Sequence, residues 1–146
     1  DTIFLRRGSH GHAHEINAEI AALLHAGRDV ALFPEGTTSD GSHLRPFHAA
    51  LLQPAVKTSR PILPLALSYH DSDGNPSQAP SYAGETSLLQ CFAAILSARS
   101  LTARIQPCPI IATCGQSRRE LARLAHSAIA HQHGYQARTS SDEHGT

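Results

Sequence analysis

The sequence of 146 residues has no methionine, no tryptophan and no excess of either charge, and these absences narrow its class. Its 12 basic and 12 acidic side chains cancel, so nothing favours the non-specific nucleic-acid binding that needs surplus positive charge. A charged fraction of 16% beside 40% hydrophobic residues excludes a highly charged disordered chain and a coiled coil. No apolar run approaches the roughly 20 residues that cross a bilayer. A single domain of ordinary size remains.

Cysteine is scarce, and methionine is missing even at position 1. The thiols of Cys91, Cys108 and Cys114 are odd in number and lack the paired spacing of a metal site. Such a set fits a reducing compartment better than a disulfide framework. The sequence opens directly into the apolar run 2–5, and domains rarely begin inside a strand. We therefore expect a portion of a longer protein, incomplete at its N-terminus.

Apolar runs and helical spacings alternate along the chain. This alternation is typical of an α/β layered domain with a mostly parallel sheet flanked by helices. The expected strands are 2–5, 30–33, 62–67 and 101–106, and the expected helices are 9–25, 47–56, 87–96 and 117–133. We assign residues 1–133 to this domain and expect the polar residues 134–146 to form a disordered tail.

Local signals predict where several elements begin or end. Gly27 stands where a helix C-terminal glycine is expected. Thr86 or Ser87 can cap the third helix, and Ser117 with a glutamate three residues later has the capping-box pattern. Pro64 cannot donate to a sheet ladder, so it predicts a kink or an end within the run 62–67.

The most informative stretch is 30–41, VALFPEGTTSDG. A buried strand would deliver a carboxylate, a glycine and consecutive hydroxyls to a loop past its carboxyl end, where α/β sheets usually bind ligands. Gly36 would let the backbone approach a ligand, and Thr37 would offer a hydroxyl. The alternative is a plain strand–turn–helix connection in which Glu35 only caps the next turn.

Three stretches together resemble a known family, the glycerolipid acyltransferases of the 1-acylglycerol-3-phosphate acyltransferase type. The family signature Phe-Pro-Glu-Gly-Thr is present at 33–37. An apolar strand that ends in arginine is matched by 3–7, where Arg7 takes the place of the family arginine and Arg6 is the alternative. A strand around proline is matched by 62–65. The blocks follow one another in the order and at the spacing of the family.

Shorter stretches extend this likeness, which covers about residues 1–115. A Leu-x-Pro-Phe stretch at 44–47 follows the signature, as it does in the family. The loop 69–74 and the Tyr-Ala-Gly-Glu stretch at 82–85 also look like the bacterial branch that includes lyso-ornithine lipid acyltransferases.

The resemblance implies an acyltransferase that moves a fatty acyl group from acyl carrier protein or coenzyme A to a lysolipid hydroxyl. The acceptor would be 1-acylglycerol-3-phosphate or a lyso-ornithine lipid, and no metal or cofactor would take part. The family places the enzyme at the cytoplasmic face of the bacterial inner membrane, because its acceptor and product are membrane lipids.

The resemblance also assigns the acceptor-binding residues. Arg7 together with Glu35, Gly36 and Thr37 would hold the polar head of the acceptor. A guanidinium suits this role because its fixed fork of donors matches phosphate oxygens. Glu35 is expected to orient Arg7 or a hydroxyl rather than touch an anionic head. Without the family context, Arg7 reads as a surface arginine paired with a neighbouring acid.

The catalytic block of the family is His-x4-Asp, which lies upstream of the arginine strand. Its histidine is the general base, and its aspartate orients the imidazole. No histidine in these 146 residues is followed five positions later by aspartate; His10 has Glu15 at that offset, and His25 has Asp29 at four. We therefore expect a carboxyl-terminal portion that is inactive alone. A non-catalytic lipid-binding domain and an unrelated α/β hydrolase-like domain remain the alternatives.

The remaining histidines offer one further candidate. His10, His12 and His14 alternate near the start of the first helix, and two of them would share a helix face as zinc ligands can. No carboxylate or cysteine completes the set, so the sequence favours a solvated helix start.

Overall fold

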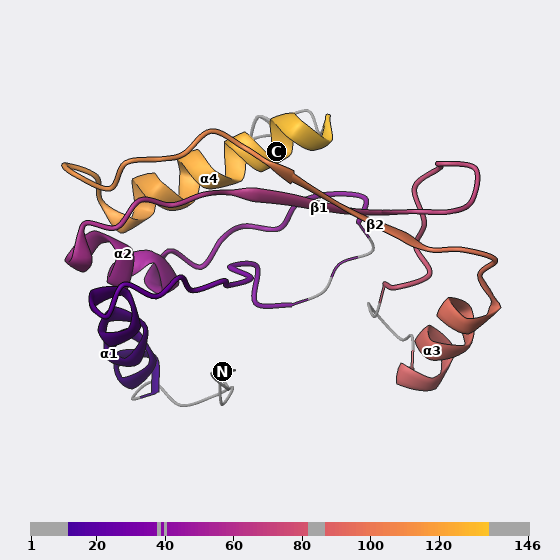
Figure 1. Cartoon of the computed structure of the whole chain (residues 1–146), viewed down its shortest axis with the longest axis horizontal. Coiled ribbons are helices and arrows are strands. Elements are labelled where there is room, and N and C mark those ends of the chain that lie inside the picture. Colours follow the sequence, from indigo (N-terminus) through magenta and orange to yellow (C-terminus); the bar gives the residue numbers. More distant parts are fainter. Residues whose placement is uncertain (1–11, 38, 40, 82–86, 135–146) are drawn as a thin grey trace, which may run out of the picture.

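The computed structural model describes residues 12–37, 39, 41–81 and 87–134. Figure 1 shows a long two-stranded ribbon with helices gathered mainly at one end of it. The elements in chain order are α1 (His12–His25), η1 (Ala49–Leu52), α2 (Gln53–Thr58), β1 (Leu65–His70), α3 (Leu88–Ser97), β2 (Thr102–Pro107) and α4 (Arg118–His133).

The ribbon pairs β1 with β2 in antiparallel register, from Leu65 opposite Pro107 to His70 opposite Thr102. Pro64 immediately precedes β1. On the amino-terminal side of Pro64, the two segments pair through an isolated bridge between Ile62 and Ile111. The expectation that Pro64 interrupts this apolar run is therefore confirmed. Its missing N–H group cannot join the ladder.

The two faces of the ribbon have different surroundings. Ala66, which lies opposite Gln106, is completely buried, and the Cys108 thiol on the same face lies 3.6 Å from the carbonyl of Ala128 in α4. Alternate residues point to opposite faces of a strand. Ile105 consequently faces away from α4 and is 62% exposed. The alternating pattern of 101–106 correctly predicts a strand, but its apolar set does not face the core of the described residues.

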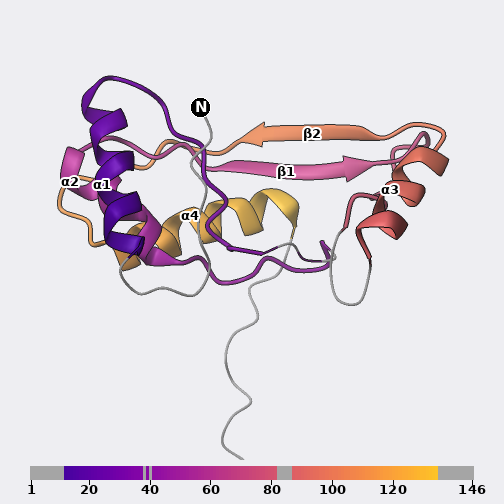
Figure 2. The ribbon, with the colours of Figure 1, turned by 90° about the horizontal axis from the view of Figure 1, so that it is seen from below.

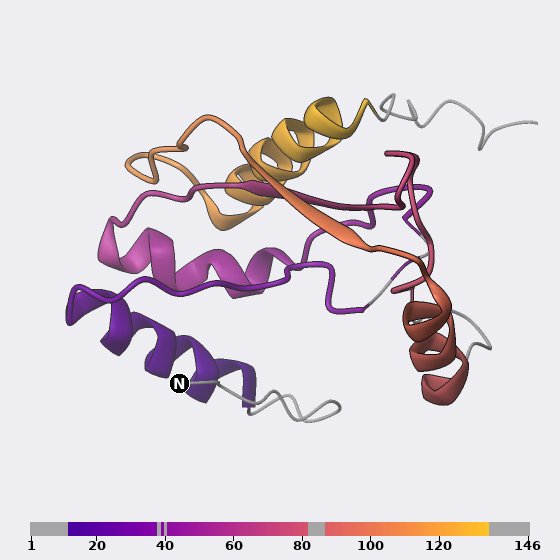
Figure 3. The same cartoon turned by 45° about the vertical axis from the view of Figure 1, so that its right-hand side comes forward.

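The hydrophobic core lies where α4, η1 and the neighbouring segments meet. Leu52, Leu121 and Ala122 form a buried cluster there, with Phe47 packed against its edge. Figure 3 shows α1 alongside α2, and contacts join the two helices. Ile16 and Ile20, one turn apart on α1, are buried, each only 6% exposed.

Several predicted helix ends are confirmed. After α1, Gly27 adopts a positive φ of 77°, and the following residue, Arg28, bonds back to the carbonyl of Leu23 at 3.0 Å, as in a Schellman end. Ser87 caps α3 in a complete capping box. Ser117 caps α4 through its hydroxyl.

Two predicted elements differ from the observed ones. Residues 30–33 are in no strand of the described chain, and the expected helix 47–56 is a 3-10 turn followed by a short α-helix with Pro54 in its first turn. Pro54 lacks the N–H that would continue the preceding turn, which explains the change of helix type. The first expected strand lies outside the described residues, as does the expected tail 134–146 apart from Gly134, which is the C-cap of α4. The mostly parallel sheet stays a prediction.

Candidate functional site

The Phe-Pro-Glu-Gly-Thr segment forms a tight turn. The N–H of Gly36 donates to the carbonyl of Phe33 at 3.2 Å, and Gly36 has a φ of 68°. This left-handed conformation favours glycine, because a Cβ would approach the carbonyl oxygen. The turn leaves Phe33 80% exposed, Glu35 half-buried, and Gly36 and Thr37 exposed.

A second segment, 45–48, holds this turn in place. The backbone N–H of Arg45 donates to Oε2 of Glu35 at 3.0 Å, and that of His48 donates to the carbonyl of Pro34 at 2.8 Å. The His48 ring also packs against Gly36, where an added Cβ would lie 2.9 Å from Cδ2 and 3.0 Å from Nε2. Glycine at this position is thus required twice, by the backbone angle and by the close approach of the ring.

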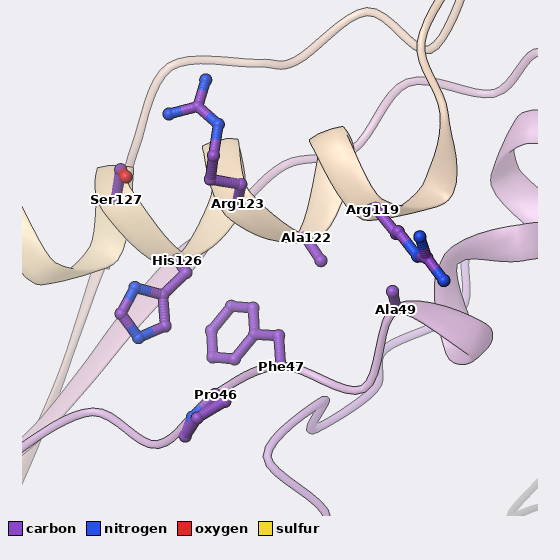
Figure 4. Close-up of a pocket in the computed structure, with 8 residues that line it drawn as sticks. All are labelled: Pro46, Phe47, Ala49, Arg119, Ala122, Arg123, His126 and Ser127. Atoms are coloured by element: carbon purple, nitrogen blue, oxygen red, sulfur yellow. The ribbon is translucent and has the colours of Figure 1, made fainter. Parts of the chain in front are cut away.

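A shallow hollow of about 400 Å³ lies on the far side of this second segment, against α4. Figure 4 shows the Phe47 ring between Pro46 and the helix, with His126 beside it. The Phe47 and His126 rings meet edge to face with centroids 5.2 Å apart, and His126 Nε2 lies 3.4 Å from the carbonyl of Leu44. The remaining lining residues are Ala49, Arg119, Ala122, Arg123 and Ser127. The segment that holds the turn is therefore itself fixed on α4.

Two guanidinium groups border the hollow, and they differ in their surroundings. Arg123 pairs with Glu120 one turn earlier at 2.6 Å, a hydrogen bond that lowers the pKa of Glu120 and raises that of Arg123. The Glu120 side chain therefore pairs with Arg123. Of the predicted capping box, only the bond from the Glu120 N–H to the Ser117 hydroxyl is present. In Figure 4, Arg119 extends toward Ala49 and Arg123 extends away from it.

The carboxyl end of α4 approaches the turn from another side. Burial lowers the pKa of His133, and the negative charge of Glu35 partly opposes that shift. Glu35 therefore has two roles in the described geometry. It accepts a backbone hydrogen bond from Arg45, and it acts electrostatically on a histidine almost a hundred residues away in sequence.

Three of the four predicted site residues, Glu35, Gly36 and Thr37, follow one another in the turn. Arg7, the fourth, lies outside the described residues. The same is true of the side chains of His10 and His12. The sequence does not single out Arg45 and His48, the two residues that hold the turn. The glycine signal at Gly36 indicates that something approaches closely, but it does not identify His48 as that neighbour. Among the described residues, no group of three metal-ligating side chains forms a cluster.

Known proteins similar to this chain agree on one family. Residues 1–68 match the family model described as Acyltransferase. The lyso-ornithine lipid O-acyltransferase of Pseudomonas aeruginosa is 38% identical over 128 residues, which cover 88% of this chain and 49% of that protein. The 1-acyl-sn-glycerol-3-phosphate acyltransferase of Neisseria meningitidis serogroup B is 38% identical over 104 residues, covering 71% and 40%. A lyso-ornithine lipid O-acyltransferase of Brucella abortus is 28% identical over 141 residues, covering 88% and 53%.

These matches identify an acyltransferase-type chain. More specifically, the chain belongs to the acyltransferase family that includes lyso-ornithine lipid and 1-acylglycerol-3-phosphate acyltransferases, as the three sequence blocks indicated. It spans about half the length of the curated relatives it matches. No solved structure matches it significantly. Within the described residues, none of the helices has the length and apolarity to span a membrane.

Proposed function

We propose that this chain supplies the acceptor-binding portion of an enzyme that transfers a fatty acyl group to the hydroxyl of a lysolipid. The observation that carries the proposal is the turn at 33–37, whose Glu35 and Gly36 are held by Arg45 and His48 within a chain of the acyltransferase family. A rigid turn of this kind suits ligand positioning, since it loses little conformational freedom on binding.

The reaction is a direct acyl transfer. The acceptor hydroxyl oxygen attacks the carbonyl carbon of a thioester carried by acyl carrier protein or coenzyme A. The new C–O bond forms as the C–S bond breaks, the hydroxyl proton passes to a general base, and the thiolate leaves and is protonated. We propose that the base is the histidine of a His-x4-Asp block, a pattern that does not occur in these 146 residues.

The described residues contribute positioning. Glu35 is a positioning residue, because its carboxylate is engaged by the Arg45 N–H and so orients its neighbours rather than meeting an anionic head. Thr37 is exposed at the turn and offers its hydroxyl to the acceptor head, while Gly36, whose own N–H bonds to Phe33, allows the tight turn that places Thr37 there. Arg7 is proposed to supply the positive charge that pairs with that head.

Acyl transfer assays test the proposal. Labelled acyl carrier protein and labelled acyl-coenzyme A are each offered with lyso-ornithine lipid or with 1-acylglycerol-3-phosphate. We expect no transfer by residues 1–146 alone and transfer by a version that includes the segment encoded ahead of residue 1. The alternative function is a non-catalytic lipid-binding domain at the membrane surface; saturable lysolipid binding without transfer by the longer version would favour it.

A further inference from the structure

The hollow beside Phe47 combines an apolar wall with charged groups. The segment 46–49 contributes Pro46, Phe47 and Ala49, and α4 contributes Arg119 and Arg123 among its five lining residues. The volume of about 400 Å³ lies within the range of small-molecule sites, which are mostly apolar with a few polar groups. Such a surface suits a ligand that is apolar along part of its length and anionic at one end.

The elements that form the hollow carry an excess of positive charge. The stretch 44–52 and α4 together contain four arginines and one acidic residue, Glu120. Glu120 is paired with Arg123 at 2.6 Å and so offsets the charge of that arginine. Arg119 lines the hollow, is exposed, and has no ion-pair or hydrogen-bond partner among the described residues. The hollow therefore offers an unpaired guanidinium to an anion.

The other carboxylates of the described residues lie elsewhere in the molecule. Figure 3 shows η1 and α2 between α4 and α1, and α1 with the turn after it carries Glu15, Glu19 and Asp29. The loop 71–75, with its two aspartates, follows β1 at the end of the ribbon where α3 lies (Figures 1 and 2). Glu35 belongs to the turn on the other side of the segment that holds it. The positive charge of the hollow is therefore not cancelled by an acidic neighbour other than Glu120.

We propose that this hollow binds the phosphopantetheine arm of the acyl donor, with the phosphate of the arm on Arg119. Acyl carrier protein and coenzyme A both carry the acyl group on this arm, which has a phosphate at one end and the thioester at the other. Between these ends, two amides alternate with methylene groups and a dimethyl-substituted carbon. The apolar parts can pack on Phe47, the Ser127 hydroxyl can bond to an amide, and the guanidinium fork matches the phosphate oxygens. The inference rests on the proposed function, for which it names the donor site.

The segment 45–48 then separates the two substrates. The turn at 33–37 is bonded to one side of this segment, and the hollow lies on its other side, against α4. The donor arm and the acceptor head approach from the two sides of one ordered segment, and the extended arm carries its thioester past the segment toward the acceptor. Substitutions in the hollow should consequently change the affinity for the donor, whereas substitutions in the turn should change the affinity for the acceptor.

Calorimetric titration of the chain with phosphopantetheine, with pantetheine and with inorganic phosphate tests the site. Phosphopantetheine should bind about tenfold or more tightly than the other two, because each of them supplies only part of the contacts. R119Q should weaken its binding about tenfold, and R119K, which keeps the charge but loses the fork of donors, should weaken it less.

R118Q is the matched control, because Arg118 is the exposed neighbour on the same helix and does not line the hollow. Its affinity for phosphopantetheine should equal that of wild type, and circular dichroism must show the same helix content in all variants. Equal affinities of wild type and R119Q, or equal losses in R119Q and R118Q, would overturn the proposal.

Kinetics of the version active in acyl transfer identify the substrate that the hollow binds. R119Q should raise the KM for acyl-coenzyme A and for acylated carrier protein about tenfold and leave the KM for the lysolipid unchanged, and R118Q should change none of them. A rise for one thioester alone would mean that Arg119 meets a part that the other donor lacks, which would overturn the assignment to the shared arm. A rise in the KM for the lysolipid alone would likewise refute it.

The two experiments separate this inference from the proposed function. Binding of phosphopantetheine that depends on Arg119, in a longer version that transfers no acyl group, would contradict only the proposed function. Acyl transfer with the same donor KM in wild type and R119Q would contradict only the role of the hollow.

Discussion

Oε2 of Glu35 accepts a hydrogen bond from the backbone N–H of Arg45 at 3.0 Å, so a side chain of the Phe-Pro-Glu-Gly-Thr turn fixes the backbone of the segment behind it. E35A removes the acceptor and should lower the free energy of unfolding by about 1 kcal/mol. E35Q keeps an acceptor oxygen at the same reach and should cost clearly less. Urea unfolding of the three proteins measures the difference. Equal losses in both variants would show that the bond contributes nothing.

The contact between Gly36 and His48 gives a second prediction with a matched control. Gly36 and Gly41 both have positive φ, 68° and 78°, but only at Gly36 would a Cβ meet another residue. G36A and G41A should each cost about 1 kcal/mol for the left-handed backbone, and G36A should cost more because the His48 ring must move. Restoring space with H48A in the G36A background should recover the excess. An equal cost at both glycines would argue against the packing.

The pH dependence of stability should report on Glu35 and His133. Burial lowers the pKa of His133 in the folded chain below its ordinary value of 6.5, and Glu35 partly restores it. Below about pH 6.5 the unfolded chain therefore binds more protons at residue 133 than the folded chain does. The contribution of His133 to the free energy of unfolding is complete above that pH and decreases as the pH falls toward the folded pKa. E35Q removes the negative charge that raises the pKa of His133, so this pKa should fall further. The free energy of unfolding should then decrease more as the pH is lowered.

Urea unfolding of wild type and E35Q at pH 7.5 and pH 5.5 measures this effect. H133Q provides the control, because the extra loss caused by E35Q at pH 5.5 should disappear once residue 133 cannot titrate. A persistent loss in E35Q/H133Q would assign the effect to another group.

How much of this arrangement the sequence predicts depends on the range of each interaction. The ends marked by Gly27, Ser87 and Ser117 follow from local hydrogen bonds, and the sequence predicts them correctly. The pairing of β1 with β2 and the exposed face of Ile105 depend on where α4 packs, which no local pattern specifies.

The same distinction applies to the candidate site. Glu35, Gly36 and Thr37 are recognisable because they form one short motif. Arg45 and His48 contact the motif after a ten-residue excursion, and His133 approaches it from the other end of the chain. Their proximity depends on tertiary packing, so sequence spacing alone does not reveal it.

The three thiols should differ in reactivity. Cys91 and Cys108 are buried and each lies against a backbone carbonyl, whereas Cys114 is exposed. Access of the reagent limits the reaction of buried thiols. Titration of the native chain with a chromogenic disulfide reagent should therefore show one fast thiol, and unfolding in urea should release two more. C114S should abolish the fast phase. Two or more fast thiols in the native chain would contradict the packing of α3 or of β2 against α4.

The central claim is that the 33–37 turn, together with Arg7, holds the polar head of a lysolipid acceptor. The most direct test is steady-state acyl transfer by the active version of the protein, with E35Q and R7A compared with wild type. E35Q is informative because it preserves the bond from Arg45 and removes only the negative charge with which Glu35 is proposed to orient Arg7. We predict that either substitution raises the KM for the lysolipid by about tenfold or more, or abolishes turnover, while the KM for the acyl donor is unchanged wherever turnover remains. An unchanged lysolipid KM and turnover in both variants would contradict the claim.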